Sequence, residues 1–254
     1  MIFPDSHKKI ERANKHIADI QFLLSQFTND PRCYSAAIQF DPKTRQNFLC
    51  ISIREDLFPS DDVALTIGDA LHNLRSALDL MYYQIVSAGD GKATDWAHFP
   101  MEDTREALEN RWLSSALKQK QVSVELGKVI VDKIKPYSTG NPLLWALHDM
   151  NITDKHKLLV PVLKLMAILD VRLEDDKGRQ VGNSIYYMDE SCNIRLRDAD
   201  DRNVTVKNKG KASAVILFGE GTPFESQTVI VSLTRITEEV TRTVEAFEML
   251  PIGE

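Results

Sequence analysis

Apolar residues recur at helical spacing in three long segments of the chain. In residues 6–28 they fall on one side, with charged residues opposite: Ile10, Ala13, Ile17, Ile20, Leu23 and Leu24. Residues 61–87 and 234–249 show the same spacing of three and four. Such spacing is typical of amphipathic helices, because each residue advances about 100° around the helix axis. We therefore predict a helix in each segment, the second capped by Ser60.

Between the first two helices the pattern changes to that of β-strands. Residues 32–40 and 46–54 are strand-like runs, and residues 41–44 between them carry the turn sequence Asp-Pro-Lys-Thr. Two such runs joined by a short polar turn predict an antiparallel hairpin.

Further helices are predicted after the long central one, which is expected to end at residues 89–91. The pattern indicates helices at 103–118, 122–136 and 142–150. Thr153 resembles an N-cap, so we expect another helix from Asp154 into the 160s. Pro161 would lie in its second turn, where it would kink or end the helix.

From residue 170 to residue 233 the chain reads as short strands separated by turns. Glycine-containing turns at 175–178, 208–210 and 219–221 divide the strand-like runs. The predicted fold class is therefore α+β: an N-terminal helical body with a β-hairpin at 32–54, then an antiparallel β section and a closing helix. We expect two domains, residues 1–168 and 169–254, the second packed on the first.

Composition excludes several classes of protein. No stretch approaches the roughly 18 consecutive apolar residues of a membrane-spanning helix, and the N-terminus lacks the features of a signal peptide. We therefore expect a cytoplasmic protein without a membrane partner. Three cysteines without a CxxC pair argue against a disulfide framework, and the net charge of −6 gives no global attraction for nucleic acid.

The most unusual segment is the predicted helix around residue 72. Gly68, His72, Arg75 and Asp79 follow one stripe beside its apolar face. An imidazole can transfer protons, a guanidinium can hold phosphate, and a carboxylate can orient either group. The stripe therefore predicts a catalytic site of His72, Arg75 and Asp79. The alternative is a buried polar seam in which the three side chains satisfy one another. Gly68 also indicates that a helix or a ligand approaches the backbone closely.

A second set of ionisable residues follows the N-cap predicted at Thr153. Asp154, Lys155 and His156 would lie in a first helical turn, where exposed N–H groups favour anions. They could bind phosphate or exchange protons, or form an ordinary solvated helix start. The spacing of Asp69 and His72 is also that of a carboxylate and an imidazole on one metal ion. A second pair of ligands, such as Asp154 with His156 or with His148, would be needed to complete such a site. The several glutamates usual in helical-bundle metal sites are not evident, and we predict no metal or cofactor.

Together the two motifs resemble a family of uncharacterised bacterial proteins. In that family a helix similar to GDALHNLRSALDHL is followed by a DKHR-like helix start, which correspond here to residues 68–81 and 154–157. The first motif also resembles, more weakly, the helical HEPN superfamily of ribonucleases and toxins, whose signature is an Arg followed four to six residues later by a His. Here Arg75 is present, but Leu80 stands where the pattern has that His.

The resemblance implies a HEPN-like protein that binds or processes a phosphate-bearing substrate, RNA or a nucleotide. It also implies a bacterial defence or toxin system, with ribonuclease-like phosphodiester cleavage or a degenerate form of it. In that hypothesis Arg75 holds phosphate, His72 and His156 act as acid and base, and Asp79 or Asp154 orients them. The alternative is a non-catalytic homodimeric scaffold, joined through the 61–87 helix, whose polar stripe is structural.

Overall fold

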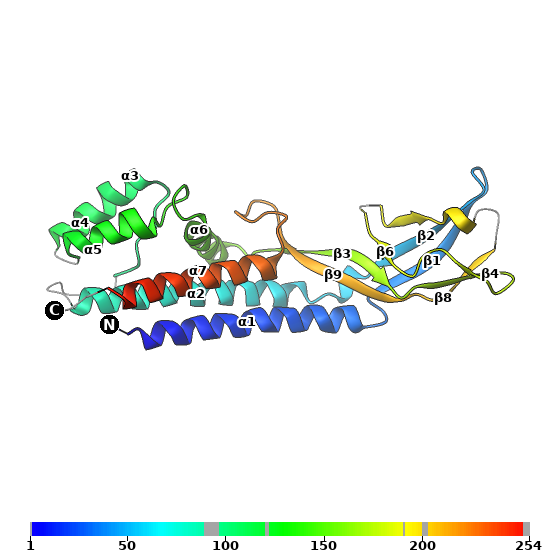
Figure 1. The fold of residues 1–254 in the computed structure, drawn as a ribbon, viewed down its shortest axis with the longest axis horizontal. Helices are drawn as coiled ribbons and strands as arrows, with labels where there is room; N and C mark the ends of the chain where they lie inside the picture. Colours follow the sequence, from blue (N-terminus) through cyan, green and yellow to red (C-terminus); the bar gives the residue numbers. More distant parts are fainter. Residues whose placement is uncertain (1, 89–96, 120–121, 190, 200–202, 251–254) are drawn as a thin grey trace. The chain divides into compact units, whose positions relative to one another are not determined.

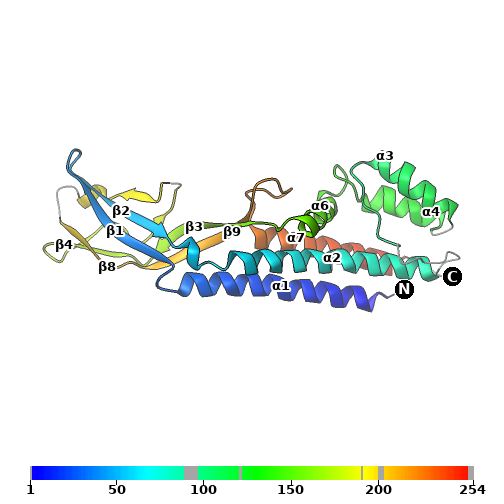
Figure 2. The ribbon, with the colours of Figure 1, turned by 180° about the vertical axis from the view of Figure 1, so that it is seen from behind.

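The computed structural model describes residues 2–88, 97–119, 122–189, 191–199 and 203–250 (Figures 1 and 2). The chain forms two compact units. The helical unit comprises Met1–Ile20, Asp61–Val160 and Phe218–Glu254. The sheet unit comprises Gln21–Ser60 and Pro161–Leu217. Helices and antiparallel strands together confirm the predicted α+β class.

The long predicted helices are confirmed as α1 (Pro4–Asn29), α2 (Ser60–Ala88) and α7 (Val229–Glu248). Within the helical unit, α2, α7 and the N-terminal part of α1 run side by side (Figures 1 and 2). The predicted stop of α2 at residues 89–91 lies outside the described residues. None of the helices formed by the described residues has both the length and the apolar character needed to cross a bilayer.

The core of the helical unit forms around α2, because apolar residues cover much of its circumference. Fully or nearly buried positions on α2 include Val63, Ile67, Leu71, Leu74, Leu78, Met81, Tyr82 and Ile85. The ring of Phe99 packs edge-on against Tyr82 and against Phe247 of α7, with centroids 6.3 and 6.2 Å apart. These aromatic contacts place residue 99, which lies outside any helix, in the core of the unit.

The helices predicted at 103–118 and 122–136 are present, and each consists of α-helical and π-helical segments. The first consists of α3 (Arg105–Ala107), the π-helical segment η2 (Leu108–Leu113) and α4 (Ser114–Lys118). The second consists of α5 (Val124–Lys128) and the π-helical segment η3 (Val129–Ile134). Thr104 and Ser123 cap the two by accepting hydrogen bonds from backbone N–H groups three residues later. Lys135, with a positive φ of 56°, ends the second.

One helix prediction is wrong. α6 runs without a break from Pro142 to His156, so Thr153 lies within it and caps nothing. The buried side chains of Leu147, Met150 and Asn151 hold residues 147–151 on one helix, and this packing overrides the turn preference of asparagine. Pro161 does not kink a helix but begins strand β3 (Pro161–Leu169), so the β section starts earlier than expected.

The described residues of the sheet unit form three three-stranded sheets, ordered β1-β2-β7, β6-β3-β9 and β5-β4-β8. The predicted hairpin is confirmed as β1 (Tyr34–Asp41) and β2 (Gln46–Ile53), paired antiparallel from Tyr34↔Ile53 to Asp41↔Gln46. The other strands are β4 (Arg172–Asp175), β5 (Gln180–Val181), β6 (Tyr186–Tyr187), β7 (Asn193–Arg195), β8 (Val204–Asn208) and β9 (Lys211–Phe218). The domain boundary predicted between residues 168 and 169 falls inside β3 and stays a prediction.

The role of α2 in the core can be tested by replacing one buried and one exposed leucine of this helix. Leu74→Ala should lower the free energy of unfolding by about 2–5 kcal/mol, because it opens a cavity at a fully buried position. Leu65→Ala on the same helix, where the side chain is 55% exposed, should change it by less than about 0.5 kcal/mol. Urea denaturation of both variants measures the difference. Equal losses would contradict the burial of this face of α2.

Candidate functional site

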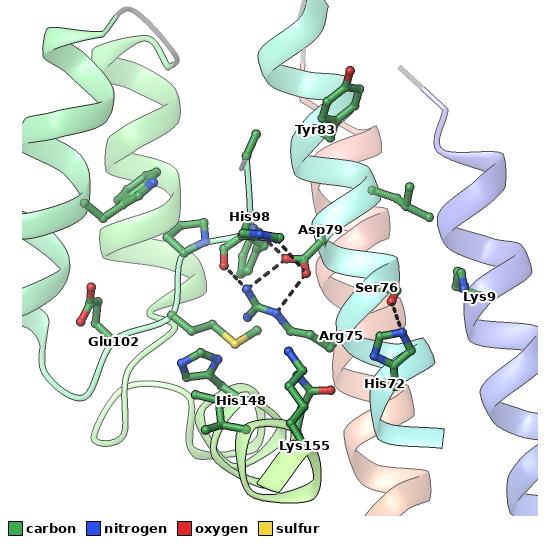
Figure 3. Close-up of a pocket in the computed structure, with 18 residues that line it drawn as sticks. Lys9, His72, Arg75, Ser76, Asp79, Tyr83, His98, Glu102, His148 and Lys155 are labelled. Atoms are coloured by element: carbon green, nitrogen blue, oxygen red, sulfur yellow. Dashed lines mark hydrogen bonds and ion pairs between the residues drawn. The ribbon is translucent and has the colours of Figure 1, made fainter. Parts of the chain in front are cut away.

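A cavity of about 700 Å³ lies within the helical unit (Figure 3). It is bounded by α2, by the segment of residues 97–102 and by α6, with Lys9 of α1 and Trp112 of η2 also contributing. Its polar lining consists of Lys9, His72, Arg75, Ser76, Asp79, His98, Glu102, His148, Asn151 and Lys155. The cavity therefore collects cationic, anionic and imidazole groups in one concave site.

Arg75 is the central polar residue of this cavity. It is only 8% exposed. Its Nη2 donates to the carbonyl oxygen of Phe99 at 2.7 Å, and its Nε donates to Asp79 Oδ2 at 3.3 Å. Nη2 also lies 3.0 Å from Asp79 Oδ1. The other amino group, Nη1, is inaccessible to solvent and has no hydrogen-bond partner among the described residues. Burial lowers the pKa of Arg75, and Asp79 opposes that shift.

Asp79 connects α2 to the segment 97–102. Its carboxylate accepts the backbone N–H of Phe99 at 2.9 Å and lies 3.4 Å from Nδ1 of His98. Together with the bond from Arg75 to the Phe99 carbonyl, these contacts fix both polar groups of the Phe99 backbone. The pair of Arg75 and Asp79 therefore orients His98, whose ring lies on the opposite side of the guanidinium from His148 (Figure 3).

His148 brings a second buried polar atom to the cavity from α6. Its Nδ1 is buried and finds no hydrogen-bond partner in the part of the chain that the structure describes. Burial and, next to it, the charge of Arg75 lower the pKa of His148 to about 4, although Asp79 and Asp103 oppose the shift. The imidazole is therefore neutral near pH 7.

The residues of the predicted stripe on α2 lie in two different environments. Arg75 and Asp79 form an ion pair, as expected if the stripe is a buried polar seam between helices. His72 does not join them. It is exposed, lies 3.5 Å from the hydroxyl of Ser76, and points to the side of α2 where Lys9 lies (Figure 3). His72 still lines the cavity, at its α1 side.

The three residues of the second motif lie in the last turn of α6, not in a first turn. The expectation of an anion site formed by the N–H groups of a helix start is therefore wrong, since the carbonyl end of a helix favours cations. Lys155 lines the cavity, whereas His156 is exposed and does not line it. His156 and His72 therefore do not share this cavity as an acid and base pair.

Asp154 instead joins the two motifs through a tight helix contact. A Cβ atom added to Gly68 would lie 2.3 Å from Oδ2 of Asp154, so only glycine lets the carboxylate rest against α2. The close approach predicted at Gly68 is thus made by α6. Oδ1 of Asp154 is buried and has no hydrogen-bond partner among the residues described. Burial raises the pKa of Asp154, as does the neighbouring Asp69.

Two imidazoles of the cavity, His98 and His148, were not among the predicted catalytic residues, and the sequence indicated His148 only as a possible metal ligand. His148, Ile152 and Lys155 repeat on α6 the spacing of a single helix face, and this pattern could have identified His148. His98 carries no such signal, because it lies on an irregular segment that is positioned by Asp79.

Neither a metal site nor a similarity to a known protein identifies a function for the cavity. The described residues contain no group of three or more His, Cys, Asp or Glu side chains that could hold a metal ion. No protein-family model, curated protein or solved structure matches the chain. The site is therefore interpreted from its own geometry.

Because Gly68 contacts Asp154, the effect of Gly68→Ala on the free energy of unfolding should change sign when Asp154 is replaced. Gly68→Ala alone should lower the free energy of unfolding by about 1–3 kcal/mol, because the new methyl group overlaps the carboxylate. In the Asp154→Ala background the same change should raise it by up to about 1 kcal/mol, the helix propensity gain of alanine over glycine. Denaturant unfolding of the four proteins measures both effects. The same loss in both backgrounds would show that Asp154 is not the neighbour of Gly68.

Proposed function

We propose that the chain binds a small phosphate-bearing molecule of the nucleotide class in this cavity. The observation that carries the proposal is the Nη1 group of Arg75, a buried cationic donor without a partner among the described residues. Leaving such a donor unsatisfied costs free energy, which a ligand oxygen would recover once the side chains that cover Nη1 move aside. A guanidinium is also the side chain best suited to the oxygens of phosphate.

The charge of the cavity favours a small ligand over an RNA chain. Of the described side chains that line it, Lys9, Arg75 and Lys155 are cationic, and Asp79 and Glu102 are anionic. Counting the imidazoles as neutral, the cavity has a formal charge of +1. RNA binding uses basic surfaces that track several phosphates. One net positive charge in a chain of net charge −6 suits a single phosphate group.

The apolar part of the lining suits the organic portion of such a ligand. Tyr83, Phe99, Pro100 and Trp112 line the same cavity as Arg75. The indole of Trp112 is held by a hydrogen bond from its Nε1 to the hydroxyl of Tyr82, 3.2 Å away. Aromatic side chains can stack on a base, which is worth about 1–3 kcal/mol in single-stranded nucleic acid complexes.

A hydrolytic activity on the bound phosphate ester is the second candidate function. It is favoured by His98, whose imidazole lies in the cavity with Nδ1 against Asp79. A carboxylate in this position orients an imidazole, an arrangement used in acid–base catalysis. In this form of the proposal His98 and His148 take the roles that the sequence had suggested for His72 and His156.

The scaffold alternative has less support from the fold. A homodimer through residues 61–87 needs an apolar face of that helix to be free, but the main apolar face of α2 is buried within this chain. Leu65 is the exposed large apolar residue of its first turns.

Ligand binding can be tested with the wild-type protein and two lysine variants, one inside the cavity lining and one outside it. We expect 5′-AMP or phenyl phosphate to raise the melting temperature, because a ligand that binds the folded state stabilises it. Lys155→Met should weaken binding by roughly three- to tenfold, the loss of one charge contact. Lys157→Met, which removes an exposed charge outside the cavity, should leave binding unchanged. Calorimetric titration gives the dissociation constants.

Two results would overturn the proposal of a small ligand. One is the absence of binding by every phosphate compound at millimolar concentration. The other is a short RNA that binds more tightly than 5′-AMP with a steep dependence on salt, the behaviour of a surface that contacts many phosphates.

The hydrolytic candidate has its own assay. If it holds, the protein releases p-nitrophenol from p-nitrophenyl phosphate or its diester, and His98→Asn lowers kcat by about 10²–10⁴-fold, the usual contribution of an acid–base group. His156→Asn is the matched control, since this exposed imidazole lies outside the cavity lining, and it should retain full activity. Wild-type protein that releases no product would exclude this candidate while leaving the binding function intact.

A further inference from the structure

Two residues that line the cavity from different helices each have a buried polar atom that the described residues leave without a partner. Nη1 of Arg75 projects from α2, and Nδ1 of His148 projects from α6. They are close enough for the charge of Arg75 to act on the imidazole of His148. In Figure 3 the His148 ring lies on the side of the guanidinium away from His98.

Both atoms are closed to solvent, so a ligand reaches them only when the side chains that cover them move aside. A hydroxyl group could then satisfy both, by accepting from Nη1 and donating to the neutral Nδ1, but the net positive charge of the lining favours an anion, and a tetrahedral phosphate presents oxygens in several directions. We propose that the cavity binds the terminal phosphate of a monoester between Arg75 Nη1 and His148 Nδ1, and that His148 takes up a proton from solvent as the dianion binds. This inference rests on the proposed function and specifies its ligand as a phosphate monoester.

The charge of the cavity gives the reason for proton uptake. With neutral imidazoles the described lining has a formal charge of +1, which matches a monoanion. A phosphate monoester is mainly a dianion at pH 7, because its second pKa is about 6. One protonated imidazole brings the lining to +2 and balances the dianion. The added proton also makes both nitrogens of His148 donors, so that Nδ1 can donate to a phosphate oxygen.

His148 is the imidazole best placed to take that proton. The charged and titratable groups around it are Arg75 and Asp79 on α2, His98, Glu102 and Asp103 on the adjoining segment, and Lys155 on α6 itself. Lys9 and His72 complete the set on the α1 side. Burial and Arg75 hold the pKa of His148 near 4, so the imidazole is neutral near pH 7 and can accept a proton. An anion within about 4–6 Å raises the pKa of a neighbouring group by about 1–3, and a dianion acts in the same direction more strongly.

The sign of the pH dependence follows from this shift. Because the bound ligand raises the pKa of His148, protonation and binding favour each other. Affinity for the monoester should therefore be greatest at lower pH and fall as pH rises through the pKa of His148 in the complex. A diester monoanion of similar size needs no added proton and should bind with little dependence on pH.

The test is calorimetric titration of the full-length protein at pH 7.0 with 5′-AMP and phenyl phosphate, in two buffers of different ionisation enthalpy. Methyl phenyl phosphate, a monoanion at this pH, is the comparison ligand. We expect roughly one-half to one proton to be taken up per monoester bound, and close to none for the diester. His148→Gln should abolish the uptake and weaken monoester binding by roughly tenfold, the loss of one charge-assisted hydrogen bond. His156→Gln should change neither quantity, and melting temperatures check that both variants fold.

The outcomes separate the two proposals. Monoester binding without proton uptake, or uptake that persists in His148→Gln, would overturn this inference and leave the proposed function standing. Absence of binding by all three ligands would overturn the proposed function itself, and this inference with it.

Discussion

The buried ion pair of Arg75 and Asp79 is the interaction on which the site depends. Removing a guanidinium and a carboxylate from water is costly, and their attraction repays this only when further hydrogen bonds complete both groups. Here the backbone of Phe99 supplies them: its carbonyl accepts from Arg75 and its N–H donates to Asp79. The pair therefore determines the path of an irregular segment whose aromatic side chain lies in the core. The one amino group that this network leaves over, Nη1, is buried and has no partner among the described residues.

A second constraint fixes the opposite wall of the cavity. Gly68 lets the carboxylate of Asp154 rest against α2, and this contact sets where α6 lies along that helix. His148 and Lys155, on the same helix as Asp154, face the cavity with Arg75 as a result. The glycine and the aspartate thus have a positioning role, whereas the arginine and the histidine each keep one buried polar atom without a partner among the described residues. Two motifs that are 86 positions apart at Gly68 and Asp154 are in this way parts of one packing arrangement.

Much of the fold could be predicted from local patterns, and the departures have physical causes. The spacing of apolar residues located α1, α2 and α7, and the turn at 41–44 located the hairpin, because these signals depend only on neighbouring residues. The end of α6 was predicted wrongly because Asn151 and Thr153 favour helix starts in isolation, whereas burial of Asn151 keeps the helix continuous. Pro161 begins a strand, where its missing N–H and fixed φ are tolerated at the first position.

For the site, the sequence identified the helix stripe but not its partners. Arg75, Asp79, His72 and Lys155 do line one cavity, while Asp154 lies at the helix contact and His156 lies outside the lining. His98 could not have been predicted, since its position depends on a tertiary bond to Asp79 and not on any periodicity. The free state of Nη1 also cannot be read from a sequence, because it depends on which of five guanidinium N–H groups the fold satisfies.

The most direct test of this account is a crystal structure of the protein grown with phenyl phosphate. The account predicts a phosphate oxygen within about 3 Å of Arg75 Nη1, with the bonds from Arg75 to Asp79 and to the Phe99 carbonyl retained. A cavity in which Nη1 is bonded to a protein group, and in which phenyl phosphate does not contact Arg75, would contradict it.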